Sequence, residues 1–267
     1  MIGFWANWKE IFSTLYLTRE LIWRLFLRDF NAKYRQSLLG VSWAIVNPLI
    51  IIGVFVFLNK SGILNIGETQ VSYPLFALIG LSLYGLFSTG LSMSANSIVS
   101  AGPMVVKINF PKISLVISSF GQAIVEFAVR CILVAVVFII FGVAPKRTVL
   151  LLPFAVIPLA LFTLGLGFFL SLLAGIFRDT IQVVSLFTTL LLFLTPVLYT
   201  TPTTGLFVIL NTWNPLSHLI IGCRDLVLFG TLSNHGGFFW SSFFSIITFL
   251  FGLKIFYIAE TKIAERV

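Results

Sequence analysis

The chain has 267 residues, of which 58% are hydrophobic and only 10% are charged. This scarcity of charge and a mean hydropathy of +1.06 exclude an ordinary soluble domain, in which roughly a quarter of the residues are charged. The net charge of +8 does not indicate nucleic-acid binding, because the basic residues lie beside apolar runs and form no separate soluble patch. We predict an all-α integral membrane protein without a nucleic-acid partner.

The N-terminal segment, residues 1–38, is predicted to lie at the cytoplasmic membrane interface, with residues 1–28 as an amphipathic helix. Apolar residues recur near one face at helical spacing, among them Trp5, Trp8, Phe12 and Trp23. Tryptophan is typical of the headgroup region, where one part of the ring can be apolar and another wet. The alternative is an amphipathic helix that packs on protein.

Six transmembrane helices are expected within residues 39–257, followed by a cytoplasmic tail at 258–267. An α-helix needs roughly 20 apolar residues to cross the bilayer core. The expected spans are 40–58, 73–98, 114–142, 149–175, 182–199 and 238–257. Residues 206–222 could form a seventh span, but Trp213-Asn214-Pro215 interrupts the run because proline removes a backbone donor. We predict a re-entrant or interfacial helical pair there, between the last two spans.

The distribution of Lys and Arg predicts that both termini are cytoplasmic. Under this orientation, the inner segments hold twelve of the 17 basic residues. The outer segments hold Lys60, Lys146, Arg147 and Arg224, and Arg130 lies within the membrane. The whole chain, residues 1–267, is then a single transmembrane domain.

The third expected span contains an acid and a base, Glu126 and Arg130. They are four residues apart and therefore share one helical face, where they can neutralise each other or meet a neighbouring helix. An unpaired charge at this depth is costly, so we predict a paired, protein-facing site inside the membrane.

Nucleotide-binding and hydrolytic motifs are absent from the sequence. No G-x-x-x-x-G-K-[ST] occurs, so any ATP and Mg²⁺ must be held by a partner chain. His218 and His235 have no carboxylate at a recognisable spacing, and Cys131 and Cys223 suggest neither a disulfide framework nor a metal site. We expect no cofactor or metal on this chain and no enzymatic activity, with a membrane enzyme or an assembly scaffold as the alternative.

A series of short motifs along nearly the whole chain is similar to the pattern of a known family. The matching residues are Arg28-Asp29, Tyr34, Leu39-Gly40, Trp43 and Pro48, then Lys107 with Phe110-Pro111-Lys112, Phe177-Arg178-Asp179, Pro196, Tyr199, Asn214-Pro215 and Arg224. The series resembles the type-2 ABC exporter permeases of the O-antigen and polysaccharide class. One departure is Gly102-Pro103-Met104, where relatives often carry Asn followed by Leu-Ile.

The resemblance implies a homodimer of six-helix subunits in the bacterial inner membrane, with two copies of a cytoplasmic ABC ATPase. It further implies export of a lipid-linked glycan, of which O-antigen on undecaprenyl diphosphate is our first expectation. Capsular polysaccharide, teichoic acid, or a drug or simple lipid are the alternative cargoes.

Two inner loops are predicted to couple the chain to the ATPase. One holds Lys107, Phe110, Pro111 and Lys112, which supply an apolar side chain, a constrained backbone and a polar anchor. The other holds Arg178 and Asp179. An ordinary proline-containing loop and simple helix capping are the alternative interpretations.

Arg28, Lys33 and Arg35 are predicted to bind the diphosphate of the lipid carrier at the inner mouth. Diphosphates favour several cationic donors, and Arg can bind them bidentately. The alternative is that this cluster only sets topology and docks the ATPase.

Four aromatic residues of the second span, Tyr73, Phe76, Tyr84 and Phe87, are predicted to line the glycan path. Their spacing places them near one helical face over roughly 20 Å, and such rings can contact the C–H faces of sugars. Helix packing or lipid contact is the alternative.

Overall fold

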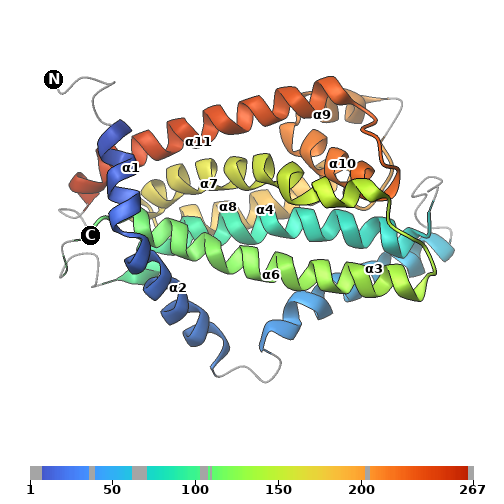
Figure 1. Ribbon diagram of the computed structural model, residues 1–267, viewed down its shortest axis with the longest axis horizontal. Coiled ribbons are helices and arrows are strands. Elements are labelled where there is room, and N and C mark those ends of the chain that lie inside the picture. The colour runs from blue at the N-terminus through green and yellow to red at the C-terminus, as the bar shows by residue number, and fades with distance from the viewer. Residues whose placement is uncertain are drawn as a thin grey trace.

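The computed structural model in Figure 1 describes residues 8–35, 40–61, 71–102, 108, 110–201 and 205–263. Helices are the only regular elements in these ranges, which confirms the all-α class: α1 (Trp8–Leu17), α2 (Arg19–Tyr34), η1 (Gly40–Ser42), α3 (Trp43–Lys60), α4 (Tyr73–Ala101), α6 (Ile113–Ile140), η2 (Arg147–Leu151), α7 (Leu152–Ile176), α8 (Thr180–Leu194), α9 (Leu206–Trp213), α10 (Pro215–Leu228) and α11 (His235–Ile263). Trp5, Leu39, Pro103, Met104, Lys107 and residues 264–267 lie outside the described ranges.

Four helical segments of the described chain are long and apolar enough to cross a membrane: α4, α6, η2 with α7, and α11. The pair α9 and α10 passes the same test together but bends by 84°, as expected from the Trp213-Asn214-Pro215 interruption. Helices α3 and α8 are apolar but shorter. Helix α8 ends at Leu194 and not at the expected residue 199, because Thr195 takes an extended conformation before Pro196.

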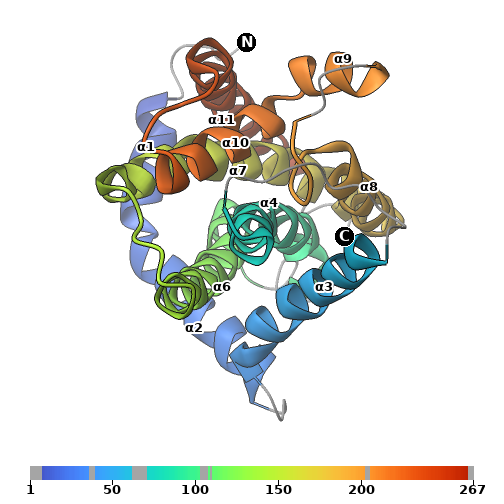
Figure 2. The ribbon, with the colours of Figure 1, turned by 90° about the vertical axis from the view of Figure 1, so that its right-hand side faces the viewer.

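Helix α4 forms the centre of the bundle. Figure 2 shows it surrounded by α3, α6, α7, α8 and α10, and most of its length is buried. Helices α7 and α11 pack closely along one side, where Gly165 faces the backbone of α11. A Cβ atom added at Gly165 would lie 2.6 Å from the carbonyl oxygen of Thr248, so the two backbones can approach this closely only around a residue without a side chain.

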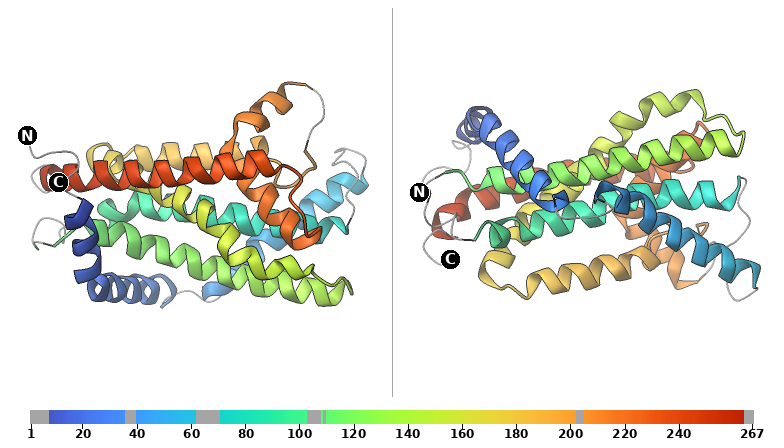
Figure 3. Two further views of the ribbon diagram at one scale, coloured as in Figure 1. Left: turned by 45° about the horizontal axis from the view of Figure 1, so that its top comes forward. Right: turned by 90° about the horizontal axis from the view of Figure 1, so that it is seen from below.

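The N-terminal segment forms two helices that meet at Thr18, and not one continuous helix. The Thr18 hydroxyl donates to the Thr14 carbonyl oxygen at 2.7 Å, and both helices lie outside the main bundle (Figures 1 and 3). Ile11 and Leu25 are buried, whereas Phe12 and Trp23 of the predicted apolar face are more than half exposed. The periodic pattern over residues 1–28 did not show this division into two helices at Thr18.

Helix α9 projects from the bundle and α10 returns into it (Figure 3). Asn214 separates them, and its side-chain oxygen accepts a hydrogen bond from the backbone N–H of Leu216 at 3.0 Å. Pro215 occupies the first turn of α10, where its missing N–H costs no helical hydrogen bond. The same residues that interrupt the apolar run therefore start a new helix in another direction.

Candidate functional site

Three charged side chains from distant parts of the chain meet on one side of the bundle. The Lys33 ammonium on α2 lies 2.7 Å from Oε1 of Glu126, and the Arg130 guanidinium lies 3.2 Å from Oε2. The side chains of Glu126 and Arg130 are only 11% and 10% exposed, and that of Lys33 is 36% exposed. One carboxylate thus binds two cations. We call this group the ion cluster.

The ion cluster connects four helices. Arg130 on α6 also donates to the carbonyl oxygen of Ala44 at the start of α3, at 3.4 Å. A side chain at Gly85 of α4 would overlap the Arg130 guanidinium, so this glycine provides the space that the guanidinium occupies. A cavity of about 240 Å³ adjoins the cluster and is also lined by Gly40, Trp43 and Asn47. The arrangement joins the end of α2 and the start of α3 to α6.

The depth of the ion cluster follows from its place on α6. Glu126 lies 14 residues before Ile140, where the helix ends, which corresponds to roughly 21 Å at 1.5 Å per residue. Helix α6 has 28 residues and is therefore longer, at roughly 42 Å, than a bilayer core roughly 30 Å thick. If Ile140 lies at one face of the bilayer core, the ion cluster lies in the opposite half of the bilayer. The first turns of α6 then extend beyond the opposite face.

The structure does not gather the three cations predicted to bind a diphosphate. Lys33 contacts Glu126, whereas the Arg28 guanidinium lies 2.7 Å from the carboxylate of its neighbour Asp29. Arg35 is exposed at the end of α2, where its N–H bonds to the Asn31 carbonyl oxygen. Lys33 is the member of this group that lies against the membrane-embedded charges, and sequence reasoning did not connect it to Glu126.

The first predicted coupling loop packs against the C-terminal end of α11. The Lys112 ammonium lies 5.1 Å from the ring centre of Phe110, and Lys112 is buried. The N–H of Ile113 donates to the Glu260 carboxylate at 3.2 Å. Phe110, the apolar side chain expected to face outward, is half-buried. The nearby Ile108 is exposed instead. Lys107 lies outside the described residues.

The second predicted coupling loop is exposed between α7 and α8. Arg178 and Asp179 are both exposed, and Phe177 beside them is 65% exposed. Sequence reasoning treated Phe177 only as part of a motif, although an aromatic residue between a long apolar helix and two charges was a usable signal. The loop offers an apolar ring with a charge of each sign beside it.

The four aromatic residues of α4 face other helices of the same chain. The Tyr73 hydroxyl donates to the carbonyl oxygen of Leu198 at 3.0 Å, and that of Tyr84 donates to the carbonyl oxygen of Thr188 on α8. Tyr84 is 4% and Phe87 is 1% exposed, and Phe87 stacks on a ring of α7. In this arrangement the rings hold neighbouring segments together, and glycan contact would require α8 to move away from Tyr84 and α7 to move away from Phe87.

Arg224 holds the bent helical pair against α4. Its guanidinium lies 3.8 Å from the ring centre of Phe76 and donates to the Pro196 carbonyl oxygen at 3.0 Å. Its neighbour Asp225 accepts from the backbone N–H and the hydroxyl of Ser233. The sequence placed Arg224 among the outer cations, but only the fold shows that it is 3% exposed and joins three segments. An arginine within an apolar helix was the available signal.

The turn that follows α8 is also fixed by side-chain hydrogen bonds. The Tyr199 hydroxyl donates to the Phe193 carbonyl oxygen at 2.9 Å. The Asn214 amide donates to the Thr195 hydroxyl at 3.1 Å. Three of the motif residues noted in the sequence, Pro196, Tyr199 and Asn214, therefore lie together around one turn.

Comparison with known proteins gives one family and several relatives. Residues 20–228 match the profile of the ABC-2 type transporter family. An O-antigen export system permease protein RfbA of Klebsiella pneumoniae is 28% identical over 89% of this chain and 91% of its own length. The RfbA protein of Myxococcus xanthus is 32% identical over 69% and 70%. A polysialic acid transport protein KpsM of Escherichia coli is 23% identical over 87% and 90%.

Proposed function

Because this chain belongs to the ABC-2 type transporter family, we propose that it is the membrane permease of an exporter for a lipid-linked polysaccharide. The observation that carries the proposal is that similar proteins named as O-antigen export permeases cover most of the chain. The KpsM relatives favour a capsular polysaccharide as the second candidate cargo. Teichoic acid, or a drug or simple lipid, remains a further alternative cargo.

The proposed topology has six spans with both termini in the cytoplasm of a bacterial cell, in its inner membrane. Helices α3 and α8 supply the two spans beyond the four long ones, and α9 with α10 forms a re-entrant pair. Helix α8 has 15 residues, or roughly 23 Å, so this span requires a locally thin bilayer or the flanking residues around the Pro196 turn. Helices α1 and α2 lie at the inner interface, where exposed Phe12 and Trp23 would contact headgroups.

The energy source is proposed to be two copies of a separate ABC ATPase, which hold ATP and Mg²⁺. This chain has no P-loop, and its two coupling loops present different surfaces. Phe177 with Arg178 and Asp179 offers an apolar anchor next to charges, the composition typical of a small docking site. The loop at Phe110 to Lys112 is anchored to α11 through Ile113 and can transmit movement into the bundle.

The permease is proposed to act as a homodimer with the glycan path between its two copies. Helix α3 leaves Ile50, Val54 and Phe57 exposed on one face. The exposed surface of α8 includes three polar residues at helical spacing, Gln182, Ser185 and Thr189, in a helix that is mostly apolar. Polar side chains on a membrane helix usually face protein or water. These observations support α3 and α8 as the faces that meet the second copy and the path.

The inner mouth is proposed to lie at the ion cluster. The lipid diphosphate would compete with Glu126 for Lys33, and its first contacts would be Arg28, exposed within α2, and Arg35, exposed at its end. Charge-assisted bonds to phosphate are strong enough to exchange with a partly exposed ion pair. Binding would then release α2 from α6, which is how substrate arrival could be communicated to the spans.

Deletion of the encoding gene in its source bacterium tests the proposed function. We expect lipid-linked glycan to accumulate inside the cell and to disappear from the surface, with recovery by the parent chain. A Phe177→Ser/Arg178→Glu variant should be inserted in the membrane but fail to restore export. If the deletion strain keeps normal surface glycan but loses the export of a drug or simple lipid, glycan export is wrong and the alternative cargo is supported.

A further inference from the structure

An apolar groove opens on the side of the bundle formed by α4, α6 and the start of α7. Its volume is about 600 Å³, and its walls include Leu83, Phe127, Phe138 and Val227. Ile139 on its rim is 80% exposed, so the groove opens toward the surroundings of the bundle. Because α4, α6 and α7 are candidate spans, those surroundings are the membrane.

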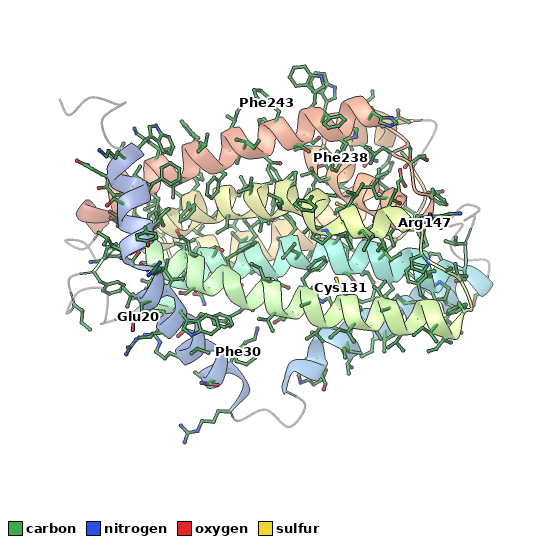
Figure 4. The ribbon with its side chains drawn as sticks, in the orientation of Figure 1. Glu20, Phe30, Cys131, Arg147, Phe238 and Phe243 are labelled. Carbon is green, nitrogen blue, oxygen red and sulfur yellow. The ribbon has the colours of Figure 1, made fainter. Side chains whose placement is uncertain are left out.

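The groove presents almost no hydrogen-bonding groups to an occupant. Ser82 is in its wall, but the Ser82 hydroxyl donates to the Leu78 carbonyl oxygen at 2.7 Å within α4. Cys131 is the other weakly polar side chain of the wall, and it lies midway along α6 (Figure 4). A hydrocarbon chain therefore suits this lining, and a sugar or peptide would lose its hydrogen bonds to water there.

The length of the groove matches one leaflet of a bilayer. Its wall on α6 extends from Phe127 to Ile139, twelve residues or roughly 18 Å at 1.5 Å per residue. Half of a hydrocarbon core roughly 30 Å thick is about 15 Å. With Ile140 at one membrane face, the groove begins at that face and ends a few ångströms beyond the midplane, which is long enough for a single lipid chain.

Two cations stand at the end of the groove that lies at the membrane face. Pro145 lines the groove, and Lys146 and Arg147 follow it directly; both are exposed, and Arg147 is visible at this end of the bundle in Figure 4. The Lys146 N–H donates to the carbonyl oxygen of Val227, a wall residue, at 3.2 Å. Among the residues that the structure describes, neither cation lies within ion-pair distance of a carboxylate.

We propose that this groove binds an anionic phospholipid, with one acyl chain between α4 and α6 and the phosphate at Lys146 and Arg147. Basic residues at a membrane surface attract anionic headgroups, and a cation pair above an apolar groove combines both parts of such a lipid. Under the proposed topology these cations are on the outer side, where Lys and Arg are scarce in this chain. Topology alone therefore does not account for them. The site lies on the α4 and α6 side, away from α3 and α8, and does not depend on which glycan is exported.

The experiment uses the full-length chain in phosphatidylcholine nanodiscs that contain a small fraction of phosphatidylglycerol with a photoactivatable acyl chain. Peptide mapping should place the label within residues 127–139, and an equal fraction of a phosphatidylcholine probe should label this segment far less. Lys146→Gln/Arg147→Gln should lower labelling by phosphatidylglycerol roughly thirtyfold, because each cation near the surface contributes about 1 kcal/mol. Lys146→Arg should retain it.

Two substitutions on α6 separate groove binding from general lipid contact. Ala135→Phe places a ring inside the groove and should lower the label strongly, whereas Ile132→Phe, on an exposed position outside the groove, should not. Equal labelling by both probes in the parent chain would mean that ordinary surrounding lipid fills the groove, and the proposal would be wrong. Label that is absent from residues 127–139 would also overturn it.

Discussion

The ion cluster gives the sharpest stability prediction because its three members differ in burial. Glu126→Gln leaves the buried Arg130 guanidinium and the Lys33 ammonium facing a neutral amide. Removing one partner of a buried ion pair typically costs about 3 to 5 kcal/mol, because the remaining charge is uncompensated. We expect Glu126→Gln to lower the free energy of unfolding by an amount in this range.

Replacement of Arg130 or Lys33 should lower the free energy of unfolding by less than replacement of Glu126, with Arg130 costing more than Lys33. Arg130→Gln leaves Glu126 bound to Lys33 at 2.7 Å, so we expect a loss of about 1 to 3 kcal/mol. Lys33 is 36% exposed, and its replacement by Gln should cost no more than about 1 kcal/mol. The double variant Glu126→Gln/Arg130→Gln should be more stable than Glu126→Gln alone, because no buried cation is left behind.

The assay is unfolding of the purified chain in mixed micelles with an increasing fraction of denaturing detergent, followed by helix content. Glu20→Gln is the matched control, since Glu20 pairs with Arg24 at 2.6 Å but both side chains are more than 70% exposed. It should change stability by no more than about 0.5 kcal/mol. If Glu126→Gln, Arg130→Gln and their double variant lose equal stability, the reasoning from burial and pairing is refuted.

Three further predictions concern packing, the aromatic stripe and docking. Gly165→Val should lower the midpoint of unfolding, whereas Gly236→Val, where an added Cβ would lie at an ordinary 3.8 Å from the Asn234 side chain, should change it far less. Similar midpoints for the two variants would show that α7 and α11 can separate without loss of stability. Tyr84→Ala/Phe87→Ala should destabilise the chain by about 3 kcal/mol or more through lost ring packing. If glycan export at matched folded protein then equals that of the parent, the stripe has a packing role alone. A cysteine at Phe177 should cross-link to the ATPase, and a complex that yields such products only from other inner positions would contradict the docking surface.

Much of the architecture could be predicted from the sequence because membrane insertion depends on local composition. Long apolar runs identify α4, α6, α7 and α11, since each must satisfy its backbone hydrogen bonds within itself in lipid. The interruption at Asn214-Pro215 likewise follows from local backbone chemistry, and the structure places an 84° bend there. The family resemblance rests on the same kind of ordered local motifs, and the match over residues 20–228 confirms it.

The tertiary structure decided what depends on contacts between distant residues. Spacing of four residues predicted that Glu126 and Arg130 could pair, but the third member, Lys33, is 93 positions away and comes close only because α2 folds along α6. Periodicity showed an aromatic face on α4 without showing that α8 covers Tyr84. The burial of Arg224 and the apolar groove lined by Phe127 likewise depend on several helices at once. A sequence pattern identifies the apolar or polar face of one helix, whereas the helix that packs against this face depends on the packing of the whole bundle.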